Sequence, residues 1–196
     1  MSIYCLGETL AGTTVVTQLP VLMIVFNRPE PTREVIAALR SLRPSRLYIA
    51  ADGPRAGRED DVRNCAEVRQ LTEMIDWPCD LQTRFQDENL GCGPGVAQAI
   101  SWFFENEAAG AIIEDDCVPH PDFLTYCAWA LEKFRDDRRV WHIGGNNFGA
   151  PAKIFGDASA GFTSLAQVWG WATWRDRWAD YQYDPSDLLE ATETLW

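Results

Sequence analysis

Three consecutive carboxylates, Glu114, Asp115 and Asp116, follow an apolar run that has the length and character of a buried strand. Adjacent like charges repel one another and gain nothing from packing, so the cluster needs another explanation. Because neighbouring side chains point in different directions where a strand ends, one carboxylate could bind a divalent cation while another meets a hydroxyl group. A solvated acidic turn is the structural alternative.

Polar residues also follow two earlier segments of strand length. Asn27 and Arg28 come after the apolar run 21–26, and Asp52 stands before a glycine after the segment 46–51. Arg28 could bind a phosphate group, and Asp52 could bind a ribose or a nucleobase. Each residue also has an ordinary structural interpretation, because Asn, Pro and Asp-Gly are typical of turns and an arginine can be a surface charge.

Segments of strand length alternate with segments of helical periodicity from about residue 21 to residue 145. The expected strands are 21–26, 46–51, 80–86, 110–116 and 139–145. The expected helices are 27–42, 60–77, 91–106 and 120–134. This alternation predicts an α/β fold with a mostly parallel sheet flanked by helices on both faces. Ligands of such sheets bind beyond the carboxyl ends of the strands, where the three polar groups are expected to converge.

Two further patterns concern the core and the ligand. In the helix 60–77 the expected core residues are Val62, Val68, Leu71 and Ile75. The glycine-rich stretch 88–95 lacks a P-loop lysine and is not G-x-G-x-x-G, so we interpret it as a helix entry that lines the site.

Tryptophans are dense near the C-terminus, where 168–178 predicts a short strand followed by a helix. Trp171, Trp174 and Trp178 stand at helical spacing, which favours core packing on one face. Trp169 and Trp171 flank a glycine, and either ring could stack on a sugar.

Composition excludes several classes of protein. The chain has 196 residues, 46% of them hydrophobic and 23% charged, which is typical of a globular domain. Its net charge of −12 is the opposite of a general nucleic-acid-binding footprint. We expect no signal peptide and no membrane span, hence a cytoplasmic protein, either free or peripheral at the inner face of the membrane. Residues 1–20 are expected to form a leader of uncertain structure before one domain, 21–196.

Five segments in this order resemble nucleotide-diphospho-sugar transferases of the GT-A fold, which are Rossmann-like. They are "VFNRPEPTREVIAAL", "IAADGPR", "ENLGCGPGVAQAISWFFEN", "IIEDDCVPHPDFLTYC" and "VWGWATWRDRW". The closest similarity is to bacterial glycosyltransferases with an EDD motif, which are distantly similar to N-acetylglucosaminyltransferase I. The resemblance covers roughly residues 22–181, and the EDD segment is its most specific part.

The resemblance implies a metal-dependent glycosyltransferase. Such an enzyme moves a sugar from a nucleotide-diphospho-sugar, here a UDP-sugar, to a hydroxyl of a glycan, lipid-linked or protein acceptor, with Mn²⁺ or Mg²⁺ as cofactor. Arg28, with Asn27 beside it, matches the position that contacts the nucleotide, and Asp52 matches the acid that holds uracil.

In the acidic triplet, the resemblance implies that Asp116 binds the metal, Asp115 faces the ribose and Glu114 lies near the donor sugar. The similar enzymes carry their catalytic base after the glycine-tryptophan stretch, where Asp180 is our choice and Asp176 and Asp184 are alternatives. A residue beyond the end of this chain is a further alternative, so 21–196 is also expected to be a truncated form of the domain.

Two other functions stay open at this point. The first is a non-catalytic or truncated remnant that binds nucleotides without turnover. The second is a sugar-nucleotide pyrophosphorylase, which would need a glycine-rich loop with Arg and Lys after the first strand. The sequence "NRPEP" at that position does not provide such a loop.

Overall fold

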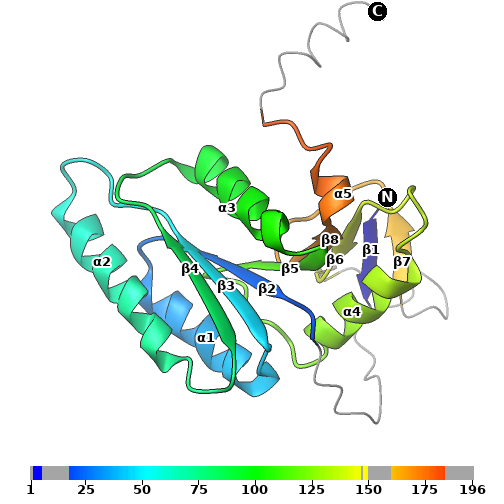
Figure 1. Cartoon of the computed structure of the whole chain (residues 1–196), viewed down its shortest axis with the longest axis horizontal. Coiled ribbons are helices and arrows are strands. Elements are labelled where there is room, and N and C mark those ends of the chain that lie inside the picture. The colour runs from blue at the N-terminus through cyan, green and yellow to red at the C-terminus, as the bar shows by residue number, and fades with distance from the viewer. Residues whose placement is uncertain (1, 6–17, 147, 150–159, 184–196) are drawn as a thin grey trace, which may run out of the picture.

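Strands and helices alternate along the chain in the computed structural model, which describes residues 2–5, 18–146, 148–149 and 160–183 (Figure 1). The strands are β1 (Ser2–Cys5), β2 (Val21–Val25), β3 (Arg46–Ala51), β4 (Asp80–Phe85), β5 (Ala109–Glu114), β6 (His142–Gly144), β7 (Ala160–Thr163) and β8 (Trp171–Trp174). The helices are α1 (Pro29–Leu42), α2 (Glu59–Gln70), the 3-10 helix η1 (Leu71–Met74), α3 (Cys92–Asn106), α4 (Phe123–Lys133) and α5 (Arg175–Trp178).

The described strands form one mixed, mostly parallel sheet in the order β4-β3-β2-β5-β8-β6-β1-β7. The neighbours β4, β3, β2 and β5 all run parallel. Strand β8 runs antiparallel between β5 and β6, and β7 runs antiparallel to β1. The predicted α/β fold with a mostly parallel sheet is therefore confirmed.

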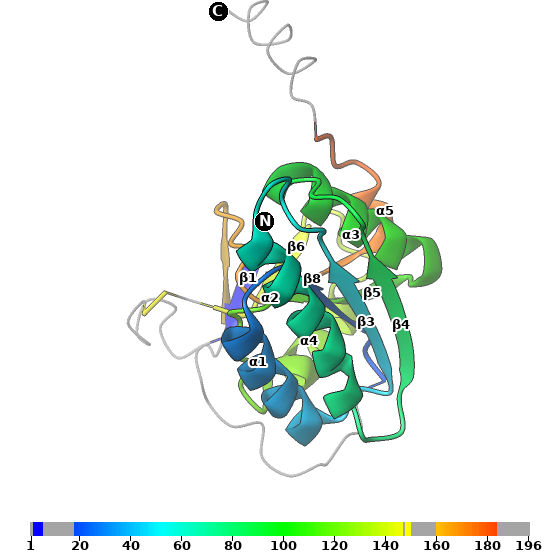
Figure 2. The same cartoon turned by 90° about the vertical axis from the view of Figure 1, so that its left-hand side faces the viewer.

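Helices cover both faces of the sheet, as Figure 2 shows from the side. Strand β2 explains why, because its side chains are apolar on both faces. Val21, Met23 and Val25 pack in a core shared with α1, α2 and α4, whereas Leu22 and Ile24 pack in a second core with α3. No helix in the described part of the chain combines the length and apolar character that a membrane span requires.

Helices α1 and α3 begin close to the polar ends of the strands, each directly after a turn. Pro29 lies in the first turn of α1, so the helix begins directly after Arg28. Gly91 precedes α3 with a φ of 82°, a conformation that glycine adopts without a steric cost. These turns bring Arg28 and the start of α3 to the carboxyl edge of the sheet.

The helix predicted over 60–77 is shorter than expected. After α2 and η1 the chain leaves helical geometry at Ile75, whose ψ is 88°. The indole of Trp77 then donates to the carbonyl of Pro44 at 3.0 Å. Val62, an expected core residue, is 56% exposed. The inward position of that turn is taken by Asp61, which is fully buried.

Two other expectations were wrong or incomplete. Trp171 and Trp174 lie in strand β8 and not on one helical face, so they enter opposite cores. Trp171 is 8% exposed, and its ring is stacked on His142, so it is not free to stack on a sugar. The segment 1–20 contains strand β1, and β7 was not predicted either.

Candidate functional site

A cleft of about 400 Å³ lies at the carboxyl ends of β2, β3, β4 and β5, against the amino-terminal half of α3. Ligands of α/β sheets bind at this edge, and the volume is typical of a small-molecule site. Its charged lining residues are Arg28, Arg55, Arg84, Asp52, Glu114 and Asp115. The structure thus brings together four of the residues selected from the sequence, and it places Asn27, Asp116 and Asp180 outside the lining.

The three carboxylates of the acidic triplet have three different environments. Glu114 ends β5 and is half-buried, Asp115 is 3% exposed, and the side chain of Asp116 is 43% exposed. The Arg28 guanidinium donates two hydrogen bonds to Asp115 and forms an ion pair with Asp116 at 3.1 Å. Because two carboxylates share one guanidinium, the triplet keeps an excess of negative charge that a bound cation could balance.

Glu114 lines the cleft, and its carboxylate has no hydrogen-bond or ion-pair partner among the residues that the structure describes. Burial, with the negative charges of Asp116 and Asp115, raises the pKa of Glu114. Burial also raises the pKa of Asp115, and the hydrogen bonds from Arg28 oppose that rise. Among the carboxylates that line the cleft, Glu114 is therefore the one with acceptor positions left for a ligand hydroxyl group.

The loop between β7 and β8 also contacts Asp116. The Trp169 indole Nε1 donates to Asp116 Oδ1 at 3.2 Å, and the Trp169 ring lies 6.0 Å from that of Phe148. His142 supports this loop, because its Nε2 lies 2.7 Å from the carbonyl oxygen of Gln167. Burial lowers the pKa of His142 to about 4, so the neutral ring donates that hydrogen bond at pH 7. Trp169 is 45% exposed, which leaves part of an aromatic ring accessible beside the triplet.

The donor set restricts the kind of metal site that is possible here. Across the described residues, no group of three or more His, Cys, Asp or Glu side chains could hold a metal ion. Asp116 is the exposed carboxylate of the triplet. Mg²⁺ is usually bound by one or two carboxylates together with substrate phosphates, and Mn²⁺ also prefers oxygen ligands. The residues therefore fit a cation that arrives with a diphosphate and do not fit a metal held by protein ligands alone.

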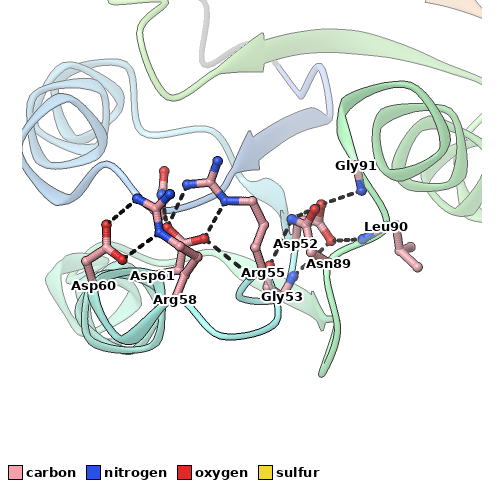
Figure 3. A network of polar contacts seen from close by, with 10 residues as sticks. Asp52, Gly53, Arg55, Arg58, Asp60, Asp61, Asn89, Leu90 and Gly91 are labelled. Carbon is pink, nitrogen blue, oxygen red and sulfur yellow. Dashed lines mark hydrogen bonds and ion pairs between the residues drawn. The ribbon is translucent and has the colours of Figure 1, made fainter.

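Asp52 lines the cleft, but groups of the protein itself occupy its carboxylate (Figure 3). Its Oδ1 accepts hydrogen bonds from the backbone amides of Gly53 and Leu90, at 2.8 and 2.9 Å. Its Oδ2 accepts from the side-chain amide of Asn89 and the backbone amide of Gly91, at 2.9 and 3.1 Å. A carboxylate has about four acceptor positions, so Asp52 is saturated and fixes the loop that leads into α3.

Asn27 and Arg55 are likewise committed to a carboxylate that the sequence analysis missed. Asp61 accepts from Asn27 Nδ2 at 2.6 Å and from two guanidinium nitrogens of Arg55, at 2.6 and 2.9 Å (Figure 3). The Arg55 guanidinium holds the pKa of Asp61 well below its usual range. The signal was present in the sequence, since Asp61 shares the i, i+4, i+7 helical face of Cys65 and Val68.

Arg84 is the second residue that sequence reasoning missed. It lies on β4, is half-buried and lines the cleft. Whereas Arg28 and Arg55 form ion pairs with aspartates, Arg84 has no hydrogen-bond or ion-pair partner within the described ranges of the chain. It is therefore the arginine of the cleft whose donors are available to a ligand.

Asp180 follows α5. This helix begins at the amino end of β5, where the Arg175 amide donates a hydrogen bond to the carbonyl of Ala108. The chain then runs back along α3, since Trp178 donates to Ser101 and the Tyr183 ring lies against Gly93. Asp180 is exposed on this returning segment.

Asp176, another candidate for the base, pairs with Arg138 and Arg177, and Asp184 lies outside the described residues.

No family model matches the chain. No curated protein matches it either.

Proposed function

We propose that the chain is a GT-A-like glycosyltransferase that binds a UDP-sugar together with Mn²⁺ or Mg²⁺ in this cleft. The observation that carries the proposal is the acidic triplet at the end of β5. Two of its three carboxylates, Asp115 and Asp116, share one guanidinium, and Glu114 and Asp115 line a cleft large enough for a nucleotide. A purely structural turn would gain nothing from this uncompensated charge.

Each residue of the triplet has a separate task in this proposal. Asp116 holds the cation through its exposed carboxylate, while buried Asp115 fixes Arg28 beside the diphosphate. When bound, the cation supplies charge neutralisation for the leaving nucleotide diphosphate. Glu114 accepts hydrogen bonds from sugar hydroxyl groups in the cleft, and the Trp169 ring packs on the sugar or on the acceptor.

The proton of the acceptor hydroxyl must pass to a base as that oxygen attacks the anomeric carbon and the nucleotide diphosphate leaves. Asp180 is our proposal for the base. The supporting observation is that its segment returns along α3 to Gly93, at the start of the helix that lines the cleft.

Calorimetric titration with UDP tests the proposal, first with Mn²⁺ and then with a chelator. We expect binding that weakens at least tenfold without the metal, because the diphosphate would then meet the acidic triplet unshielded. Equal affinity in both conditions would contradict a metal-dependent site.

The non-catalytic alternative is favoured by one observation, namely that Asp180 is not among the residues that line the cleft. Release of UDP from UDP-glucose and UDP-N-acetylglucosamine, with water or added sugars as acceptors, separates the two functions. Binding without any release would favour a nucleotide-binding remnant.

A further inference from the structure

One row of side chains crosses the floor of the cleft. Arg84 on β4 is the register partner of Ala50 on β3, Ala50 is the partner of Ile24 on β2, and Ile24 is the partner of Glu114 on β5. All four residues line the cleft. Neighbouring strands lie about 4.8 Å apart, so the row spans about 14 Å. The four strands that carry it lie side by side in Figure 1.

The two ends of this row carry opposite charges, and each lacks a partner in the part of the chain that the structure describes. Arg84 offers up to five N–H donors, and Glu114 offers acceptor positions. Ala50 and Ile24 between them are apolar, and Ala50 is small, so a flat group can lie against the sheet there. The floor thus fits an elongated ligand with acceptors at one end and donors at the other.

The other charged groups of the cleft already form hydrogen bonds or ion pairs within the protein. Asp52, which the resemblance matches to the uracil-binding acid, already accepts four hydrogen bonds, three from the loop before α3 and one from the amide of Gly53. Arg55 is held by buried Asp61, and Arg28 by Asp115. These residues already interact with groups of the protein, whereas Arg84 has all its donors left for a ligand within the described ranges.

We propose that Arg84 binds the carbonyl oxygens of the nucleobase and that Glu114 binds hydroxyl groups of the donor sugar. The nucleotide then lies across β3 and β2. This placement rests on the proposed function. The orientation follows from Asp116, which is adjacent to Glu114 in the chain, so the cation and the diphosphate belong at that end. The nucleobase then reaches the far end of the row, where Arg84 lies.

The test compares UDP and inorganic pyrophosphate, both with Mn²⁺, by calorimetry on the wild-type chain and on Arg84→Gln. We expect Arg84→Gln to weaken UDP by about tenfold or more, the usual effect of losing a hydrogen bond to a charged group. Pyrophosphate should bind equally to both proteins, because it has no base. Arg63→Gln is the charge-matched control, since Arg63 is exposed on α2 and does not line the cleft.

The outcomes separate the placement from the function. UDP binding that is unchanged in Arg84→Gln would overturn the placement and leave the proposed function intact. Equal losses for UDP and pyrophosphate would show that Arg84 binds the diphosphate, which also overturns the placement. A wild-type chain that binds neither ligand would overturn the function and the placement together.

A second variant tests the orientation. Glu114→Gln should not weaken UDP binding, because UDP lacks the donor sugar whose hydroxyl groups Glu114 binds. A loss of UDP affinity equal to that of Arg84→Gln would contradict the proposed direction of the ligand.

Discussion

The carboxyl edge of the sheet contains two groups of acidic residues that look alike in the sequence and differ in the structure. Asp52 and Asp61, on the β3 side, are saturated by amides and guanidinium groups of the protein. Glu114 and Asp116, on the β5 side, keep acceptor positions and share in an excess of negative charge. The comparison teaches that a carboxylate at a strand end keeps acceptor positions for a ligand only where no neighbouring loop supplies its donors.

The largest effect that would sharpen this comparison is expected for Asp61→Ala. Removing the carboxylate leaves Arg55 and Asn27 without their partner, so we expect the melting temperature to fall on the order of 10 °C. Because the folded-state pKa of Asp61 is lowered, its contribution is complete above about pH 4 and is lost as the pH falls further.

The matched control is Asp60→Ala, at the neighbouring residue. Asp60 pairs with Arg58, and both side chains are about half exposed, at 48% and 52%, so its removal should shift the melting temperature by only about 1–2 °C. Equal shifts for Asp60→Ala and Asp61→Ala would contradict the structural role of Asp61.

Asp52→Ala comes next in size. It removes the acceptor of three backbone amides and one side-chain amide, and we expect a loss of about 2 kcal/mol in the free energy of unfolding. Hydrogen exchange should become faster at the amides of Leu90 and Gly91. Asp87→Ala, at an exposed residue close to the same loop, is the control. Unchanged exchange at both amides would show that Asp52 does not fix the loop.

The fold was largely predictable because its signals are local. The continuous apolar run of β2 and the helical face of Val35, Ile36 and Leu39 on α1 are dictated by burial in a two-sided sheet. The helical spacing of the tryptophans gave the wrong prediction for β8. A three-residue interval fits one face of a helix, but in a strand it places the two side chains on opposite faces. Strand β1 depends on pairing with β6 and β7, which a four-residue segment cannot reveal.

The site was less predictable, because residue type does not tell which partner a side chain will find. Asp52 and Asn27 were reasonable ligand candidates until their donors and acceptors were found in the segments 89–91 and 55–61. Arg84 gave no signal within β4, since its importance comes from the absence of a carboxylate near it among the described residues and from its register with Ala50. Such information is tertiary and does not exist in any one segment.

The central claim is that the exposed end of the acidic triplet holds a divalent cation together with a nucleotide. The most direct measurement is the melting temperature of the wild type, Asp115→Asn and Asp116→Asn, each with UDP and with or without Mn²⁺. Without ligands, Asp115→Asn should be the less stable variant, because Asp115 is buried against Arg28. Asp116→Asn should lose the Mn²⁺-dependent rise seen with UDP. The claim is contradicted if Asp116→Asn keeps the full rise, or if Asp115→Asn loses more of it.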